Sequence, residues 1–331
     1  MHKINNVVNI RKLPKVELHV HLESCFPEET AKYLAKKNRC FLPEYVFDSN
    51  GKYNCSDFME FLKNSDLVAR AIQRPEDYEL ITYEYLKESA GQSVIYTELM
   101  VCPDYAFIAG ITYKEMIEGI AKGINRAEKF GIISRIILLV IRHFGPETAT
   151  SLLKKCKEYE HPYVVGVTLA GDETKYNVSD FAHVFKEFYK QSIKCTPHAG
   201  EISGPESVEE VLKHYPVFRI GHGVRSIEDT KLIKSIINKD IALEVCPTSN
   251  IKLGVYNTYK DHPLRKLHDL GVKITLNSDD PPFFKTSINN EYFIAHSEFG
   301  FSENELLEIT KNGIKYSFLD SKTKQTLLSK L

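Results

Sequence analysis

The stretch "ELHVHLES" at residues 17–24 decides the fold, because it alternates polar and apolar residues as a β-strand does. Residues two apart in a strand point to the same face, so His19 and His21 share one side of a sheet and Glu23 follows them. Two imidazoles and an acid at one strand end indicate a functional site. A polar strand end with two solvated histidines is the alternative, and the rest of the chain decides between them.

Eight short runs rich in β-forming residues recur along the chain, and amphipathic runs separate most of them. The expected strands are residues 16–22, 94–101, 134–142, 164–170, 193–199, 218–224, 241–247 and 273–279. Strands that alternate with helices form parallel β-α units, and eight units predict a closed (β/α)8 TIM barrel of the α/β class. An open doubly wound sheet has a similar rhythm and is the alternative. No linker divides residues 1–331, so we expect one domain.

The segment after the first expected strand is the longest gap, about seventy residues. It holds two helical patterns, "FPEETAKYLAKKN" at residues 26–38 and "SDFMEFLKNSDLVARAI" at residues 56–72. We expect these additional helices, inserted after strand one, to cover one mouth of the barrel as a lid. Three later helices are expected to take Ser179, Ser207 and Ser226 as their N-terminal caps.

The composition excludes several classes of partner. The formal net charge is -1, so no basic excess favours nucleic acid. The longest apolar run, residues 132–141, is interrupted by Arg135 and is too short to span a bilayer, so we expect no membrane partner. Seven scattered cysteines without a CxxC pair, and an N-terminus without a signal-like apolar stretch, predict reduced thiols and a cytoplasmic location.

Side chains that can do chemistry lie at or just after the ends of the expected strands. In a barrel the C-terminal strand ends form one face, and active sites occur there. Residues about 260 positions apart, such as His19 and Asp279, are therefore expected to meet. The candidates are His19, His21, Glu23, Gly171, His198, Glu201, His222, Asp279 and Asp280.

Three of these histidines and one carboxylate suit zinc or a similar divalent ion. The expected ligands are His19, His21, His198 and Asp279. A Lewis acid there lowers the pKa of a bound water from about 15.7 toward about 7. Glu201 lies three residues beyond His198, close enough to reach a substrate, and His222 and Asp280 are candidates for orienting the water and accepting its proton.

Each candidate also has a purely structural interpretation. His222 lies between two glycines and can be a core histidine, Glu201 can be an exposed loop acid, and Asp279 with Asp280 can form a solvated turn. The joint occurrence of these residues at successive strand ends favours a metal-dependent hydrolase site.

Six motifs carry a resemblance to a known family, in the order "LPKVELHVHLES", "TLAGDE", "HAGE", "RIGHGV", "EVCPTSN" and "LNSDDPPFF". Together they closely resemble the adenosine deaminase family of the amidohydrolase superfamily, from about residue 13 to the C-terminus. The resemblance implies one zinc ion per subunit. The ligands that it implies are His19, His21, His198 and Asp279.

The resemblance also implies roles for the remaining candidates. Glu201 donates a proton to the purine N1, and His222 orients and deprotonates the attacking water. Asp280 holds the attacking hydroxide and hydrogen-bonds the purine N7. Gly171 matches the backbone position that contacts N3, and Glu23 stands where many adenosine-using relatives have an Asp on the ribose 5′-hydroxyl. The catalytic residues are thus Glu201, His222 and Asp280, and the substrate contacts are Glu23, Gly171 and Asp280.

Two departures from the family pattern bear on which purine is used. Glu23 replaces the usual Asp and Ser24 replaces a usual Gly, which narrows the sugar end of the pocket. However, "SDDPPFF" lacks the Gly-Gly pair of adenine deaminases and looks more like adenosine-using enzymes. We therefore expect a purine nucleoside substrate, with deamination of adenosine and 2′-deoxyadenosine to the inosine products and ammonia in purine salvage. The alternatives are adenine, another 6-aminopurine nucleoside, and an inactive purine-binding barrel.

Overall fold

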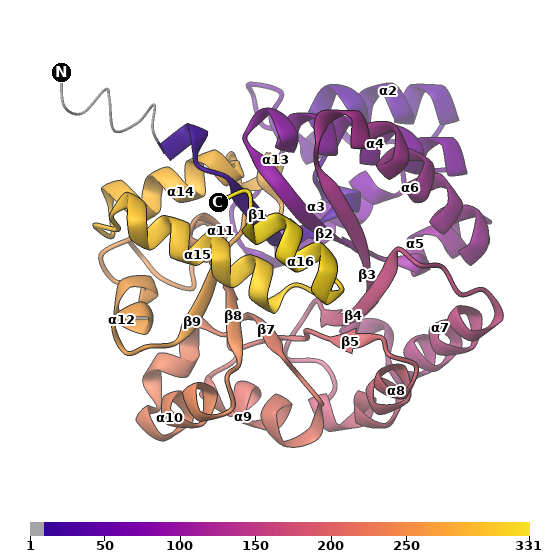
Figure 1. The fold of residues 1–331 in the computed structure, drawn as a ribbon. Coiled ribbons are helices and arrows are strands. Elements are labelled where there is room, and N and C mark those ends of the chain that lie inside the picture. The colour runs from indigo at the N-terminus through magenta and orange to yellow at the C-terminus, as the bar shows by residue number, and fades with distance from the viewer. Residues whose placement is uncertain (1–9) are drawn as a thin grey trace.

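Parallel strands form the centre of the molecule (Figure 1). The computed structural model describes residues 10–331. Its strands are β1 (Lys15–His21), β2 (Val94–Val101), β3 (Ile133–Ile141), β4 (Val164–Ala170), β5 (Lys194–Cys195), β6 (His198–Ala199), β7 (Arg219–His222), β8 (Ala242–Val245) and β9 (Lys273–Leu276). Hydrogen bonding orders them β1-β2-β3-β4-β5 and β6-β7-β8-β9. Every expected strand is present, which confirms the α/β class.

The fifth expected strand is split at Pro197. The Thr196 N–H donates to the Val167 carbonyl of β4 at 3.0 Å, as a continuous ladder requires. Pro197 has no N–H to continue that ladder, and its carbonyl instead accepts from the Gly221 N–H of β7 at 3.0 Å. Pairing therefore changes partner at the proline, and β5 and β6 are two halves of one barrel strand.

The first and last strands close the ring. The His21 N–H donates to the Asp279 carbonyl at 3.1 Å, and the Asp279 N–H donates to the His19 carbonyl at 3.2 Å. These bonds form a parallel bridge between Val20 and Asp279 just beyond the end of β9. The closed ring confirms the expected TIM barrel and excludes the open sheet.

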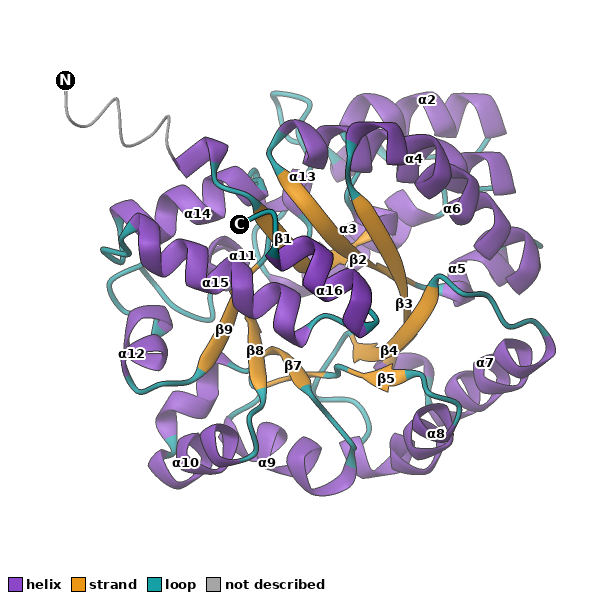
Figure 2. Cartoon of the chain, in the orientation of Figure 1, coloured by secondary structure: helices purple, strands orange, loops and turns teal. Residues whose placement is uncertain are grey.

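Helices surround the barrel on the outside (Figure 2). They are α2 (Glu28–Asn38), α3 (Phe58–Ala69), α4 (Pro75–Gly91), α5 (Pro103–Ile108), α6 (Tyr113–Ala127), α7 (Pro146–Glu158), α8 (Val178–Lys190), α9 (Pro205–His214), α10 (Thr230–Asn238), α11 (Pro247–Lys252), α12 (Leu264–Asp269), α13 (Pro281–Phe284), α14 (Ile288–Ser297), α15 (Glu303–Tyr316) and α16 (Ser321–Leu328). Short 3-10 turns are η1 (Leu22–Ser24), η2 (Glu44–Val46), η3 (Glu128–Phe130), η4 (Arg142–Phe144) and η5 (Val224–Glu228).

Side chains fill the barrel interior toward the N-terminal ends of the strands. Arg219 is fully buried there, with nitrogens 2.5 Å from a carboxylate oxygen of Glu98 and 2.5 Å from one of Glu244. Phe318, in the loop between α15 and α16, stacks on the guanidinium of Arg219 at 3.8 Å. Because this end of the barrel is filled, the barrel interior has room for a ligand toward the C-terminal ends of the strands.

Two helices, α2 and α3, lie between β1 and the barrel helix α4. The Phe61 ring of α3 packs on Phe283 and Phe284 of α13, with ring centroids 5.5 and 5.0 Å apart. This packing seats α3 over the C-terminal mouth of the barrel, where several of its side chains line a cavity. The additional helices expected after strand one are therefore present, and one of them, α3, covers that mouth.

The expected serine caps are wrong. Helix α8 follows Asn177, α9 follows Gly204, and α10 follows Asp229, which accepts backbone hydrogen bonds as its cap. Ser207 lies inside α9 because Pro205, which suits a first helical turn, starts that helix earlier. The Ser207 hydroxyl accepts from the Gly200 N–H at 2.7 Å instead.

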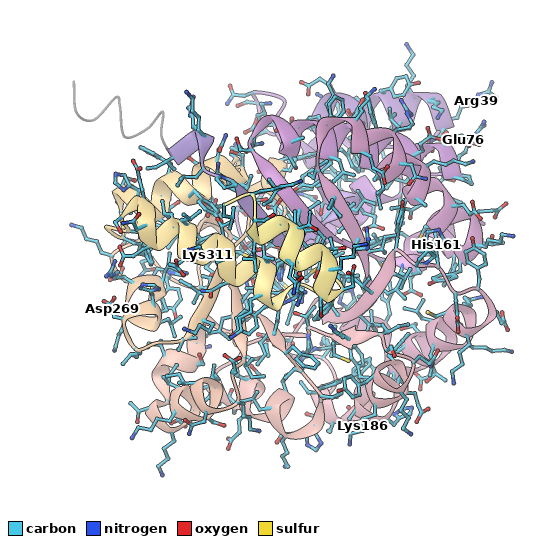
Figure 3. The ribbon with its side chains drawn as sticks, in the orientation of Figure 1. Arg39, Glu76, His161, Lys186, Asp269 and Lys311 are labelled. Atoms are coloured by element: carbon cyan, nitrogen blue, oxygen red, sulfur yellow. The ribbon has the colours of Figure 1, made fainter. Side chains whose placement is uncertain are left out.

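Charged side chains of both signs lie around the outside (Figure 3). Arg39, Glu76, Lys186 and Asp269 are exposed examples from four different helices or their ends. The mixture agrees with the formal net charge of -1. Within residues 10–331, no helix combines the length and the apolar character that crossing a membrane requires.

Candidate active site

The predicted site residues converge at the C-terminal mouth of the barrel, around a cavity of about 90 Å³. Eight of the nine line this cavity: His21, Glu23, Gly171, His198, Glu201, His222, Asp279 and Asp280. The ninth, His19, is fully buried directly behind them. The solvated alternatives for the strand end, the loop acid and the tandem acids are wrong, because these groups are almost all buried.

Four of these side chains present their donor atoms to one point. Nε2 of His19 lies 3.4 Å from Oδ1 of Asp279, and Nε2 of His21 lies 3.2 Å from the same oxygen. Nε2 of His198 lies 3.4 Å from Nε2 of His21. The three histidines and the carboxylate that the sequence predicted as ligands therefore form one compact donor set.

Hydrogen bonds behind two of the imidazoles fix which nitrogen faces this point. Nδ1 of His19 lies 2.9 Å from Oε2 of Glu244 in β8. Nδ1 of His198 lies 3.0 Å from the Thr168 hydroxyl in β4. Such outer partners commonly set the ring orientation of metal-binding histidines. Neither Glu244 nor Thr168 was among the residues predicted from sequence, although a lone glutamate inside the apolar run "IALEVC" was a usable signal for Glu244.

Glu244 is itself held by a buried network. Its other carboxylate oxygen accepts from the Thr196 hydroxyl and from Arg219 Nε, each at 2.5 Å. Burial alone raises the pKa of Glu244, but Arg219 and His19 outweigh it and hold the pKa below its usual value. Glu244 therefore stays ionised behind His19.

The donor set fits a divalent cation. The Nε2 atom of His19 is buried and has no hydrogen-bond partner among the described residues, although carboxylates surround it. Burial lowers the pKa of His19, but the neighbouring carboxylates of Asp279 and Glu244 outweigh burial and raise that pKa to about 10. The surroundings thus favour positive charge at this point. Three imidazoles and a carboxylate are a ligand set that zinc accepts.

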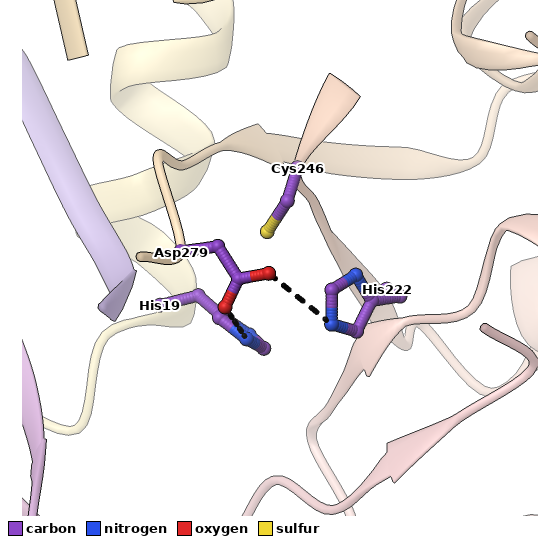
Figure 4. A group of neighbouring side chains, drawn as sticks. All are labelled: His19, His222, Cys246 and Asp279. Atoms are coloured by element: carbon purple, nitrogen blue, oxygen red, sulfur yellow. Dashed lines mark ion pairs between the residues drawn. The ribbon is translucent and has the colours of Figure 1, made fainter. Parts of the chain in front are cut away.

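Figure 4 shows Asp279 between His19 and His222, with the thiol of Cys246 directed toward the same group. His222 Nε2 is 3.9 Å from Oδ2 of Asp279, farther than either His19 or His21 is from Oδ1. His222 is thus placed beside the donor set.

His222 and Glu201 form a candidate base and acid. Their Nε2 and Oε1 atoms are 3.6 Å apart. Burial lowers the pKa of His222 to about 3, so its ring is neutral and able to accept a proton. Burial and the charge of Asp279 raise the pKa of Glu201 well above its usual value, so its carboxyl keeps a proton to donate.

Asn250 sets the orientation of His222. The Asn250 amide lies 3.2 Å from Nδ1 of His222, and Nε2 of His262 lies 3.1 Å from Oδ1 of Asn250. His262 had no role in the sequence analysis, because its link to the site runs through a side-chain contact that no sequence spacing reveals.

Two site residues have a backbone conformation that L-residues rarely adopt. The φ angle is 56° at His222 and 65° at Asp279. Neither residue is glycine, so each conformation carries strain that the surrounding structure maintains. Strain of this kind is common where a side chain must be aimed at a functional point.

The remaining three predicted residues lie around the substrate side of the cavity. Asp280 accepts a hydrogen bond from the Ser24 hydroxyl, and burial raises its pKa well above the usual value. Burial raises the pKa of Glu23 to about 8, although its Oε1 accepts from the Cys102 N–H at 3.0 Å. Gly171 has φ 98°, and a Cβ there would lie 2.9 Å from Nδ1 of His143, so only glycine fits.

A family model and a sequence relative match almost the whole chain. The model described as "Adenosine deaminase" matches residues 14–331. An adenine deaminase of Rhizobium rhizogenes is 42% identical over 320 residues, which is 96% of this chain and 99% of the relative.

Solved structures of deaminases and amidohydrolases are also similar to this chain. The crystal structure of adenine deaminase from Arthrobacter aurescens has a TM-score of 0.90 at 27% identity, covering 96% of this chain and 97% of that one. An amidohydrolase from Burkholderia ambifaria with bound zinc has a TM-score of 0.89 at 26% identity, covering 98% of this chain and 90% of that one. The bound zinc supports a divalent metal, and the likenesses together support hydrolytic deamination of a purine. By sequence and by fold, the chain belongs to the adenosine deaminase family.

Proposed function

We propose that the protein is a zinc-dependent adenine deaminase, which converts adenine and water to hypoxanthine and ammonia. The observation that carries the choice of adenine is the similarity to relatives described as adenine deaminases, at 40–42% identity over 96% of the chain. This choice of substrate differs from the expectation from sequence, which placed adenosine before adenine because of the motif "SDDPPFF".

The pocket supports a small substrate. Its volume of about 90 Å³ is well below the roughly 300 Å³ at which pockets for drug-sized ligands begin. Glu23 is buried at its wall, fixed by the Cys102 N–H, on the side where the family resemblance places the sugar. Ser24 is buried against Asp280. Both departures from the family pattern therefore fill space that a ribose needs.

We assign the metal ligands to His19, His21, His198 and Asp279, with one zinc ion per chain in a cytoplasmic enzyme of purine salvage. A bound zinc ion supplies Lewis acidity, which lets water act as a nucleophile near neutral pH. The rest of the chemistry belongs to side chains on the cavity wall.

In the proposed pose, C6 of the purine faces the donor set. His222 is neutral and accepts the proton of the attacking water, and Glu201 is protonated and donates to N1. Asp280, oriented by Ser24, contacts N7, and the backbone at Gly171 faces N3. The C–N bond to the exocyclic amine then breaks, and ammonia leaves with the proton that the side chains returned to it.

A substrate comparison tests the proposal. Purified zinc-loaded protein is assayed for ammonia release with adenine, adenosine and 2′-deoxyadenosine in parallel. We expect kcat/KM for adenine to exceed that for either nucleoside by at least about 100-fold, the discrimination available when a substituent has no room. A preference for a nucleoside overturns the proposal. Turnover of none of the three indicates a non-catalytic purine-binding barrel.

A further inference from the structure

Several polar side chains on the cavity wall have no role in the reaction as described above, and three of them are an acid, a phenol and an imidazole. They are Asp66 of α3, Tyr105 of α5 and His143 of η4, and all three line the same cavity as Glu201 and Asp280. The Tyr105 hydroxyl donates to Oδ1 of Asp66. No hydrogen bond reaches Oδ2 of Asp66 from any group in residues 10–331, so one carboxylate oxygen remains able to accept.

The proposed pose of the purine determines which of its edges these three side chains face. With C6 at the donor set, N1 at Glu201 and N7 at Asp280, the edge of the purine that carries N3 and N9 faces the opposite wall. That wall includes Gly171, and Nδ1 of His143 is 2.9 Å from where a Cβ of Gly171 would be. The Asp172 N–H also points at this nitrogen, at 3.5 Å. His143 therefore borders the N3 and N9 edge.

Asp66 lines the same cavity as His143, and His143 is near enough for its charge to act on the Asp66 carboxylate. Burial raises the pKa of Asp66, and the Tyr105 hydroxyl and the nearby His143 both counteract that rise. The three side chains thus form one polar group, the Asp66 cluster, on α3, α5 and η4. In the proposed pose, we place this cluster at the edge of the purine that carries N9, on the same cavity as the donor set.

We infer that Asp66 accepts the N9–H of free adenine and so adds to the selection of the base over the nucleoside by Glu23 and Ser24, with Tyr105 holding the Asp66 carboxylate in place. This inference rests on the proposed function. A free base has a hydrogen on N9, whereas a nucleoside has ribose there and nothing to donate. A pocket built to pair a substrate hydrogen discriminates strongly against an analogue without it, because the buried acceptor is then unpaired.

The test uses 9-methyladenine, which replaces the N9 hydrogen by one methyl group. The measured quantity is the ratio of kcat/KM for adenine to kcat/KM for 9-methyladenine. Wild-type zinc-loaded protein is expected to show a ratio of at least about 100. Asp66→Asn keeps the side-chain volume and removes the charged acceptor, and Asp66→Ala removes it entirely. Both are expected to bring the ratio below about 10 by lowering the adenine value, and Tyr105→Phe is expected to lower it in part.

Asp104→Ala is the matched control, because Asp104 is a half-buried acid on the same helix as Tyr105 that does not line the cavity. It is expected to keep the wild-type ratio. If the Asp66 variants slow both substrates equally, Asp66 only anchors α3 and the inference is wrong. If Glu23→Gln abolishes the discrimination while the Asp66 variants keep it, the acceptor is Glu23. Wild-type protein without adenine turnover refutes the proposed function itself, a separate result.

Discussion

Glu201 is the residue whose chemistry depends most directly on its surroundings. Burial and the charge of Asp279 raise its pKa, which favours the protonated carboxyl. Glu201→Gln keeps the shape but cannot transfer a proton, so we expect kcat for adenine to fall by about 10³. Zinc content, measured by atomic absorption, should be unchanged. Glu209→Gln on the exposed side of α9 is the control, and near-normal kcat in Glu201→Gln removes the acid role.

The positions of the strand ends could predict the donor set and the residues that face the cavity, but not the residues that orient them. His19, His21, Glu201 and Asp280 each follow from position in a barrel strand or the loop after it. Asn250 acts on His222 through a side-chain contact across two loops, and no spacing in the sequence encodes such a contact. For the same reason, Asp66 looked like one more polar residue of an amphipathic helix.

At the scale of the element, β8 links the donor set to the filled end of the barrel through Glu244. Glu244→Gln loses the charge that holds His19, so we expect zinc affinity to fall by about 10- to 100-fold. The measurement is a competition titration against a chelator. Glu98→Gln is the control, because Glu98 shares Arg219 with Glu244 but does not touch His19. Equal weakening in both variants contradicts a specific role for Glu244.

Helix α14 carries a buried acid away from the site. Glu291 accepts from the Thr248 N–H at 3.1 Å and from the Thr286 hydroxyl, and burial raises its pKa to about 7. An unfolded glutamate ionises near pH 4.3, so the folded protein binds more protons between about pH 4.3 and 7. Stability that this carboxyl contributes is therefore present below that window and is lost as the pH rises through it.

Glu291→Gln removes this dependence. We expect the Tm of the variant minus that of wild type to increase as the pH rises from 5 to 7, and then to level off. Differential scanning calorimetry at several pH values measures the difference. A difference that stays constant across the window shows that Glu291 ionises normally in the folded protein.

Elements differed in how far sequence could predict them. The strands were predictable because their apolar runs are distinct and bounded by polar strand ends. The break at Pro197 and the helix starts were not, since Asn177 and Asp229 compete with nearby serines as caps and only the packed loops decide. The position of α3 over the C-terminal mouth of the barrel could be predicted from the length of the insertion after strand one alone. A long insertion at that point has few other surfaces on which to pack.

At the scale of the whole molecule, the ring of barrel strands is closed by residues of the candidate active site. The backbone bonds that join the first and last strands belong to His19, His21 and Asp279, three of the proposed metal ligands. A cation held by them connects the two ends of the barrel, and ligands that bind only the folded state raise its stability. The eightfold alternation made the barrel predictable, but the placement of the seam at the ligands became apparent only from the hydrogen bonds.

The most direct test of the account is a zinc titration of the metal-free protein with adenine as substrate. Metal is removed with a chelator, zinc is added stepwise, and hypoxanthine formation is followed. We expect almost no turnover without zinc, and a linear rise in turnover that ends at one equivalent of zinc per chain. Full turnover by the metal-free protein, or none at saturating zinc, contradicts the claim that these strand ends form a zinc-dependent adenine deaminase.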